Sequence, residues 1–236
     1  MIRVSGLEKK FGRQTVLNGI ELDIAEGGIY AILGPNGSGK TTLIKCILGL
    51  THPNEGEIFI HDKAVRGKWK YRNAINYLPQ IANFPENLRV KELFSMIKDI
   101  RQSPGRDERL IEIFNLEPYL NKKLSTLSGG TVQKVNLVLT FMFDSPIVIL
   151  DEPTSGLDPL AMLKLKELIR QERAAGKTLI ITTHIMQFVE EVSDRIVYLL
   201  EGKIYYSGSV QGLLEKTQQQ DLEHAIAHIT KQELYA

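Results

Sequence analysis

One nine-residue stretch, GPNGSGKTT at residues 34–42, constrains the fold of this chain more than any other feature. It matches the phosphate-binding loop pattern G-x-x-x-x-G-K-[ST] (Walker A, or P-loop) at every fixed position, between an apolar strand pattern at 29–33 and a helical pattern that ends at Gly49. Such a loop turns successive backbone N–H groups inward, and the dipole of the following helix adds positive potential there. The stretch therefore predicts an anion cradle; the alternative is a glycine-rich turn that binds nothing.

Two side chains of this loop are expected to act on a bound nucleotide. Lys40 would reach the β- and γ-phosphates, and the hydroxyl of Thr41 would ligate Mg²⁺. The remaining residues of the loop would complete the phosphate contacts: Gly34, Pro35, Asn36, Gly37, Ser38, Gly39 and Thr42.

Composition excludes several other classes of protein. The 236 residues carry a net charge of +1 with acidic and basic residues interleaved, so no nucleic-acid-binding surface is expected. The single cysteine, Cys46, rules out an internal disulfide and is expected to be a buried, unreactive thiol. No apolar run approaches the roughly 20 residues needed to span a bilayer, and no export signal is apparent, so we expect a soluble chain.

The order of hydrophobic patterns predicts an α/β fold with a mainly parallel sheet. We expect a nucleotide-binding core made of residues 1–86 and 128–217, with an antiparallel β subdomain at its N-terminal end. Residues 87–127 read as a helical insertion, and residues 218–236 as a helical tail.

Two loops stand out from this pattern. Trp69 and Tyr71 lie in a basic loop, and we expect both to pack against the core or its rim. The segment 81–88 contains apolar Ile81, Phe84 and Pro85 where a surface loop is usually polar, which indicates a docking site for another molecule.

A pair of carboxylates, Asp151 and Glu152, follows the apolar strand pattern at 147–150. At the carboxyl end of a buried parallel strand beside the phosphate loop, Asp151 would hold Mg²⁺ and Glu152 would orient and deprotonate the attacking water. The alternative is a pair of solvated charges or a helix cap. Taken alone, the Asp–Glu pair slightly favours this alternative, and only its combination with the phosphate loop favours the functional interpretation.

Two further groups bear on phosphate chemistry. The stretch LSGGT at 127–131 opens a helical pattern and predicts a second anion site, unless Ser128 is an ordinary N-cap. His184 follows the strand pattern ending at Thr183 and could donate a hydrogen bond to a γ-phosphate or to water, although a lone histidine is more often structural.

Taken in order, these motifs resemble the ATP-binding cassette (ABC) family of transporter ATPases, over residues 2 to about 214. The resemblance rests on Phe11, the phosphate loop, Gln80, the LSGG signature, the Asp151–Glu152 pair, SGLD at 155–158 and His184. It implies the ABC ATPase fold, ATP as the nucleotide, and hydrolysis coupled to transport.

The resemblance also assigns roles. Phe11 would stack on adenine, and Gln80 would ligate Mg²⁺ and sense a membrane domain faced by residues 81–88. Ser128, Gly129 and Gly130 would contact the γ-phosphate of ATP bound to a second copy, in a head-to-tail homodimer whose subunits are linked through Asp158. Glu152 would be the catalytic base and His184 the switch histidine. Thr131 and Lys134 stand where the family usually has Gln and Arg.

The expected partner is an integral membrane permease, and the expected location is the cytoplasmic face of the cell membrane. The stretches at 77–90 and 200–209 resemble the cassette of the nitrous-oxide-reductase copper-maturation system, an export-type system. The alternative is a soluble cassette ATPase acting on DNA or ribosomes. His224 and His228 read as exposed helix positions rather than metal ligands.

Overall fold

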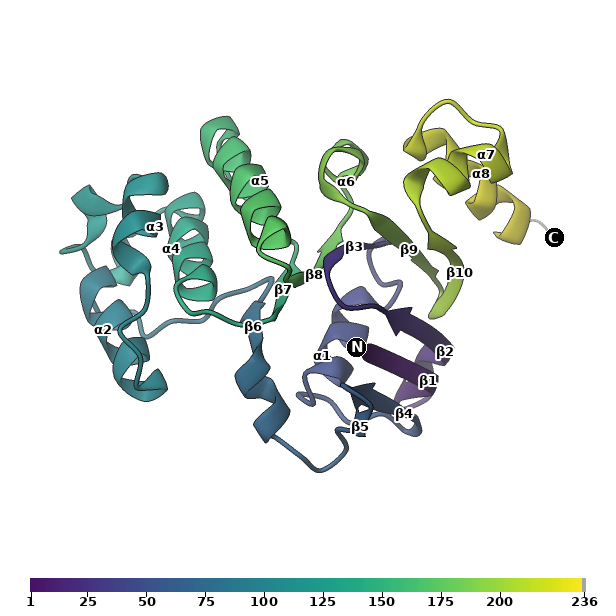
Figure 1. Cartoon of the computed structure of the whole chain (residues 1–236), viewed down its shortest axis with the longest axis horizontal. Helices are drawn as coiled ribbons and strands as arrows, with labels where there is room; N and C mark the ends of the chain where they lie inside the picture. The colour runs from purple at the N-terminus through teal and green to yellow at the C-terminus, as the bar shows by residue number, and fades with distance from the viewer. Residues whose placement is uncertain (235–236) are drawn as a thin grey trace.

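The computed structural model describes residues 1–234, and this part of the chain folds around two β-sheets (Figure 1). The strands are β1 (Ile2–Phe11), β2 (Gln14–Ile24), β3 (Gly28–Leu33), β4 (Glu55–Ile60), β5 (Lys63–Ala64), β6 (Ile75–Leu78), β7 (Ile147–Asp151), β8 (Thr178–Thr183), β9 (Arg195–Leu200) and β10 (Lys203–Gly208). The α-helices are α1 (Lys40–Ile47), α2 (Val90–Arg101), α3 (Asp107–Ile113), α4 (Gly129–Phe141), α5 (Pro159–Ala174), α6 (Met186–Val192), α7 (Val210–Thr217) and α8 (Leu222–Leu234). Short 3₁₀ turns are η1 (Lys70–Ala74), η2 (Glu117–Tyr119) and η3 (Leu124–Thr126).

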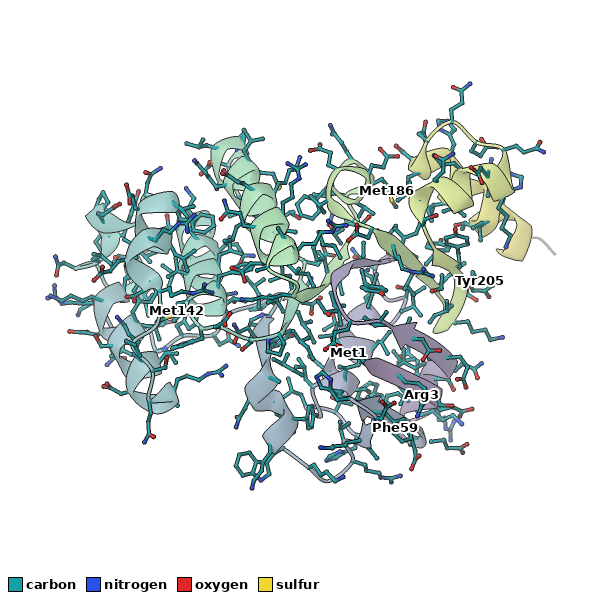
Figure 2. All side chains as sticks on the ribbon, in the orientation of Figure 1. Met1, Arg3, Phe59, Met142, Met186 and Tyr205 are labelled. Atoms are coloured by element: carbon teal, nitrogen blue, oxygen red, sulfur yellow. The ribbon has the colours of Figure 1, made fainter. Side chains whose placement is uncertain are left out.

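The smaller sheet is antiparallel and lies at the N-terminal end of the chain, as the sequence predicts. Its strand order is β2-β1-β4-β5, and each neighbouring pair runs antiparallel. Along much of β1 and β2, buried apolar residues alternate with exposed polar ones, so one face is left to solvent. On that sheet Arg3 and Phe59 are cross-strand partners, and the guanidinium lies 4.7 Å from the ring centroid (Figure 2).

The larger sheet has the order β10-β9-β3-β8-β7-β6 and is parallel except for β10. Strands β3, β7 and β8 are buried along almost their whole length, which explains why they carry unbroken apolar runs rather than an alternating pattern. Register pairs Asp151 with Thr182 and Leu33 with Thr183. The carboxyl ends of β3, β7 and β8 therefore meet at one edge, where the phosphate loop begins.

Helices cover both faces of the larger sheet. Helix α1 is buried between the two sheets and shares its apolar cluster with residues from both. Helices α2 to α6 contribute to a second cluster on the opposite face, and α7 and α8 pack with α6 and with β3 and β9 in a third. Figure 1 shows α2, α3 and α4 gathered at one end of the molecule and α7 and α8 at the other.

Three features differ from what the sequence patterns predict. Helices α6 and α7 were not expected: both are short, no neighbouring motif marks them, and α7 carries Gly212 in its interior, which weakens a helical pattern. The expectation that Trp69 packs against the core or rim is wrong: its side chain is 61% exposed. Tyr71 does pack, with its hydroxyl donating to the Ile47 carbonyl at 3.1 Å. Among the described residues, no helix combines the length and hydrophobicity required to cross a membrane.

Candidate nucleotide-binding and hydrolysis site

The phosphate loop has the shape of a cradle because glycine is the only residue that fits at two of its positions. A Cβ added at Gly34 would lie 2.1 Å from the Leu199 carbonyl oxygen. Gly39 has a φ of 108°, and a Cβ there would lie 2.9 Å from the Val16 carbonyl oxygen. No side chain caps the start of α1, so its first N–H groups remain available to an anion.

Lys40 is folded over this loop. Its Nζ donates to the carbonyl oxygens of Gly34 at 2.8 Å and Pro35 at 3.1 Å. Burial lowers the pKa of Lys40, and the nearby carboxylates of Glu152 and Asp151 oppose that shift. The ammonium group therefore lies where the sequence predicts contact with phosphates, between the loop and the acidic pair.

Asp151 fits a cation ligand. The residue is fully buried, and its Oδ1 accepts hydrogen bonds from the hydroxyls of Thr41, at 3.3 Å, and Thr182. Its Oδ2 is also buried but has no hydrogen-bond partner among the described residues. An unpaired carboxylate oxygen is costly in a protein interior, and a bound cation would remove that cost. Thr41 and Asp151 thus present the hard oxygen donors that suit Mg²⁺.

Glu152 is held in an unusual backbone conformation. Its φ is 51°, in the left-handed region, and its N–H donates to the Thr182 carbonyl oxygen at 3.1 Å. The side chain is almost completely buried, and Oε2 lies 3.0 Å from Nδ1 of His184. The His184 side chain is itself 61% exposed. The carboxylate is therefore fixed at the edge of the sheet, with an exposed histidine beside it.

One cavity of about 440 Å³ brings much of the predicted site together. The Phe11 side chain is 52% exposed and borders this cavity, with the ammonium of Lys9 at 4.8 Å from its ring centroid. Sequence reasoning missed two contributors, because Gln14 and Val16 belong to a plain strand pattern with no local signal. The lining residues are Phe11, Gln14, Val16, Asn36, Gly37, Gly39, Lys40, Thr41, Thr42, Gln80 and Glu152.

The predicted second phosphate site lies outside this cavity, at the exposed start of α4. Ser128 is the N-cap of that helix, and its Oγ accepts from the Thr131 N–H at 3.3 Å and lies 2.9 Å from Thr131 Oγ1. Both Ser128 and Gly129 are exposed. The N-cap alternative is therefore present in the structure, and it leaves the N-terminus of α4 open to an anion.

The start of α4 is packed against the loop at residues 154–158. A Cβ at Gly130 would lie 2.5 Å from the Gly156 carbonyl oxygen. Asp158 caps α5 by accepting from the Ala161 N–H at 2.8 Å, and it forms an ion pair with Lys134 at 2.6 Å. That bond with Lys134 is the main cause of the lowered pKa of Asp158. Lys134 is a contributor that the sequence marked only as a departure from the usual Arg.

A phosphate loop, a buried Asp–Glu pair and a parallel sheet define a phosphate-loop nucleotide hydrolase. Comparison with known proteins specifies the family. The family model described as "ABC transporter" matches residues 17–155, which is more than half of the chain. The chain belongs to the ABC transporter family and is an ATP-binding, ATP-hydrolysing subunit of that family.

Individual relatives agree. The chain is 35% identical over 217 residues to the Nod factor export ATP-binding protein I of Burkholderia lata, covering 89% of this chain and 71% of that protein. It is 29% identical to the L-cystine import ATP-binding protein TcyN of Bacillus subtilis over 100% of this chain and 96% of that one. The solved structure of an ATP-binding subunit of an ABC transporter superposes with a TM-score of 0.90 at 30% identity, covering 98% of this chain and 100% of that one. A dimeric bacterial cassette, MJ0796, superposes with a TM-score of 0.81 at 27% identity, covering 89% and 98%.

Proposed function

We propose that this chain forms a head-to-tail homodimer whose ATP-driven closure energises a separate membrane-spanning subunit. The observation that carries the proposal is the division of the site into two surfaces. The cavity at the phosphate loop and the exposed start of α4 do not share lining residues. Two copies related by a two-fold axis bring each surface against the other and so complete two identical sites.

In each completed site, one copy would bind most of the nucleotide. Phe11 offers its exposed ring face to adenine, while the loop backbone and Lys40 hold the phosphates. Asp151 and Thr41 would hold Mg²⁺, with Gln80 at the wall of the same cavity as a further ligand. When bound, Mg²⁺ offsets the negative charge that builds up on the transferring phosphoryl group.

The second copy would supply Ser128, Gly129 and Gly130 to the γ-phosphate, with Asp158 near the junction of the two copies. Glu152 would accept the proton of the attacking water, because its carboxylate borders the cavity and is held in place by the His184 contact. His184 is exposed enough to turn towards a γ-phosphate when a second copy closes over it.

Residues 81–88 are the proposed docking point for the membrane subunit. The Ile81 side chain is 74% exposed, and the segment follows Gln80, which borders the nucleotide cavity. Movement of this loop therefore reaches the Mg²⁺ ligands directly. We place the chain at the cytoplasmic face of the cell membrane on this basis.

We infer an export-type system from the relatives named as Nod factor export proteins, which are more similar in sequence than the cystine importer. The link with copper-site maturation rests on the stretches at 77–90 and 200–209. The membrane subunit that binds this chain would identify the substrate.

Purification from solubilised membranes tests the proposal. The tagged Glu152→Gln chain, purified with MgATP, is expected to bring down a multi-helix membrane protein in a fixed ratio to itself. Adding Ile81→Asp to the Glu152→Gln chain should abolish this recovery, while nucleotide binding persists. Recovery with ribosomes or DNA instead would contradict the proposal and support the soluble ATPase alternative.

A further inference from the structure

The segment 63–72 forms a strongly basic surface that the nucleotide site does not use. Its sequence, KAVRGKWKYR, carries five cationic side chains and no acidic one, although the whole chain has a net charge of only +1. We call residues 63–72 together with Leu50 the basic–aromatic surface. Local charge of this kind is not visible in the overall composition, from which only the absence of a nucleic-acid-binding surface was expected.

This surface is anchored rigidly to the end of α1. Arg72 donates to the Gly49 carbonyl oxygen at 3.0 Å, and the Tyr71 hydroxyl donates to the Ile47 carbonyl oxygen at 3.1 Å. Both acceptors lie at the end of the helix, where carbonyl groups lack partners within the helix. Arg72 and Tyr71 therefore fix the segment, and they are not free to bind a ligand strongly themselves.

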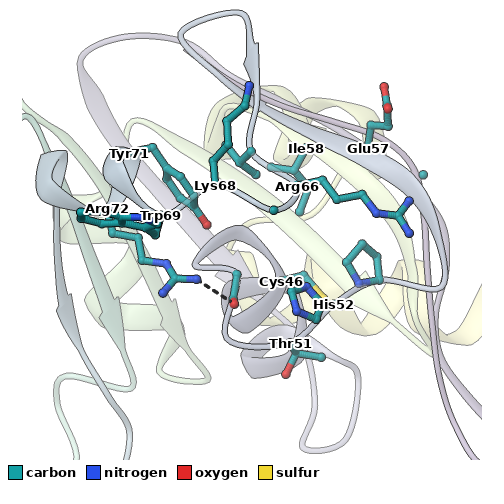
Figure 3. A pocket seen from close by; sticks show the side chains of 15 residues that line it. Cys46, Thr51, His52, Glu57, Ile58, Arg66, Lys68, Trp69, Tyr71 and Arg72 are labelled. Atoms are coloured by element: carbon teal, nitrogen blue, oxygen red, sulfur yellow. Dashed lines mark hydrogen bonds between the residues drawn. The ribbon is translucent and has the colours of Figure 1, made fainter.

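Between the segment and α1 lies a cavity of about 270 Å³ (Figure 3). Arg66, Lys68 and Trp69 line it from the segment, and all three are labelled in Figure 3. Of the side chains that line this cavity, Glu57 alone is acidic.

The exposed cations of this surface have no acidic partner among residues 1–234. Arg66, Lys68 and Lys70 are exposed, and none of them forms an ion pair within residues 1–234. Two large apolar side chains are exposed as well: Trp69, within the segment, is 61% exposed, and Leu50, which follows the Gly49 that Arg72 contacts, is 57% exposed. Exposed apolar side chains set among unpaired cations indicate a contact with something that is both anionic and apolar.

We propose that the basic–aromatic surface binds the anionic phospholipid headgroups of a membrane, with Trp69 and Leu50 at the boundary between headgroups and acyl chains. Clusters of Lys and Arg are attracted to anionic lipid, and the amphipathic indole favours the same boundary. A nucleic acid or a wholly acidic peptide would satisfy the cations but offers no aliphatic layer for Leu50. The surface precedes the four-residue strand β6 and the loop 81–88 follows it, so the proposed lipid contact and the proposed permease contact use different residues.

Vesicle binding by the full chain tests this inference without a permease. Trp69 is the only tryptophan, so its emission reports on this surface directly. Adding vesicles that contain phosphatidylglycerol is expected to shift the emission to the blue and to float the chain with the vesicles, and added salt should weaken both. Vesicles of phosphatidylcholine alone should do neither.

Charge variants supply the control. Lys68→Gln with Lys70→Gln should weaken binding by about 25-fold, at about fivefold per charge removed near an anionic surface. The control is the double variant Lys122→Gln, Lys123→Gln, which loses two exposed charges from the segment before α4. This variant should bind the vesicles as strongly as the unmodified chain does. Three results would each overturn the lipid assignment. They are an equal loss of vesicle binding in both double variants, binding to phosphatidylcholine as strong as binding to phosphatidylglycerol, and a blue shift with polyglutamate or DNA equal to that with vesicles.

This result is separable from the proposed transport function. Glu152→Gln should bind vesicles as strongly as the unmodified chain, because the nucleotide site takes no part. Failure to bind vesicles would overturn the lipid inference, while recovery of a membrane subunit tests the proposed function by itself.

Discussion

At the scale of single residues, the contact between Glu152 Oε2 and His184 Nδ1 decides how the site is poised. The two atoms lie 3.0 Å apart; the Glu152 side chain is almost completely buried, and the His184 side chain is mainly exposed. The contact keeps the carboxylate at the cavity while the imidazole stays free to move. If Glu152 is the general base, as proposed, its carboxylate is already held at the cavity before water and ATP arrive.

The first prediction follows from that arrangement. Glu152→Gln keeps the size and the hydrogen-bonding capacity of the side chain but removes its basicity, so ATP should still bind while turnover falls by at least about 100-fold. Phosphate release and equilibrium nucleotide binding measure the two effects separately. Glu223→Gln, an exposed change on α8, is the matched control and should leave turnover unchanged. If Glu152→Gln hydrolysed ATP as fast as the unmodified chain does, Glu152 could not be the catalytic base.

Cys46 supports a second prediction, about reactivity and pH. Burial raises the pKa of its thiol to about 11, so the side chain stays protonated in the folded chain at neutral and mildly alkaline pH. We expect no reaction with an alkylating reagent at pH 8 until the chain is unfolded by urea. Because folding disfavours the thiolate, the stability contributed by this group is lost as pH rises from the unfolded value of 9.0 towards 11. Rapid alkylation of the folded chain would contradict this.

The residues of the site differ in how far sequence reveals them. The phosphate loop and the Asp151–Glu152 pair are predictable because each is contiguous and its chemistry depends on local backbone geometry. Thr182 is not, since its bond to Asp151 arises only from the register of β7 against β8. Burial of the Cys46 thiol is confirmed, and its helical pattern was a sufficient signal.

At the scale of elements, the junction between α4 and the loop at 154–158 links the two halves of the site within one chain. Gly130 approaches the loop backbone so closely that no side chain fits, whereas Gly129, one residue earlier, faces open space. The Lys134–Asp158 ion pair joins the same two elements at 2.6 Å. A change in the position of α4 should therefore move the start of α5.

A matched pair of glycine variants tests that junction. Gly130→Ala would place a methyl group 2.5 Å from the Gly156 carbonyl oxygen, and we expect it to lower the free energy of unfolding by about 1–3 kcal/mol. Gly129→Ala meets nothing within 4 Å and should leave stability nearly unchanged. Urea denaturation followed by circular dichroism compares them, and equal midpoints would mean that the junction is loose.

Elements are predictable from sequence to the extent that their patterns are long. The parallel strands, the hairpin of β9 and β10, and helices α2 and α5 follow from continuous or periodic apolar residues. Helices α6 and α7 were missed because they are short and stand alone, whereas α1, which is as short as α7, is marked by the phosphate loop before it. The exposure of Trp69 was missed for a different reason: an aromatic residue is usually buried, and only the finished surface shows that no other element covers it.

At the scale of the whole molecule, α1 lies between two sheets with its N-terminus at the nucleotide cavity and its C-terminus at the basic–aromatic surface. The same helix therefore contributes to the phosphate site at one end and anchors the proposed lipid contact at the other. The surface that we propose as the second part of the hydrolysis site, at the start of α4, lies outside the cavity and remains exposed. An isolated copy is thus expected to bind ATP but to hydrolyse it poorly.

The most direct test of this account is the mass of Glu152→Gln in solution, measured by sedimentation velocity with and without MgATP. The account predicts a monomer without nucleotide and a dimer with MgATP, and it predicts that adding Gly129→Asp to the same chain prevents the dimer by placing a negative charge at the proposed γ-phosphate contact. A chain that binds MgATP yet stays monomeric, or a dimer that forms equally well with Gly129→Asp, would contradict the divided site on which the proposed mechanism depends.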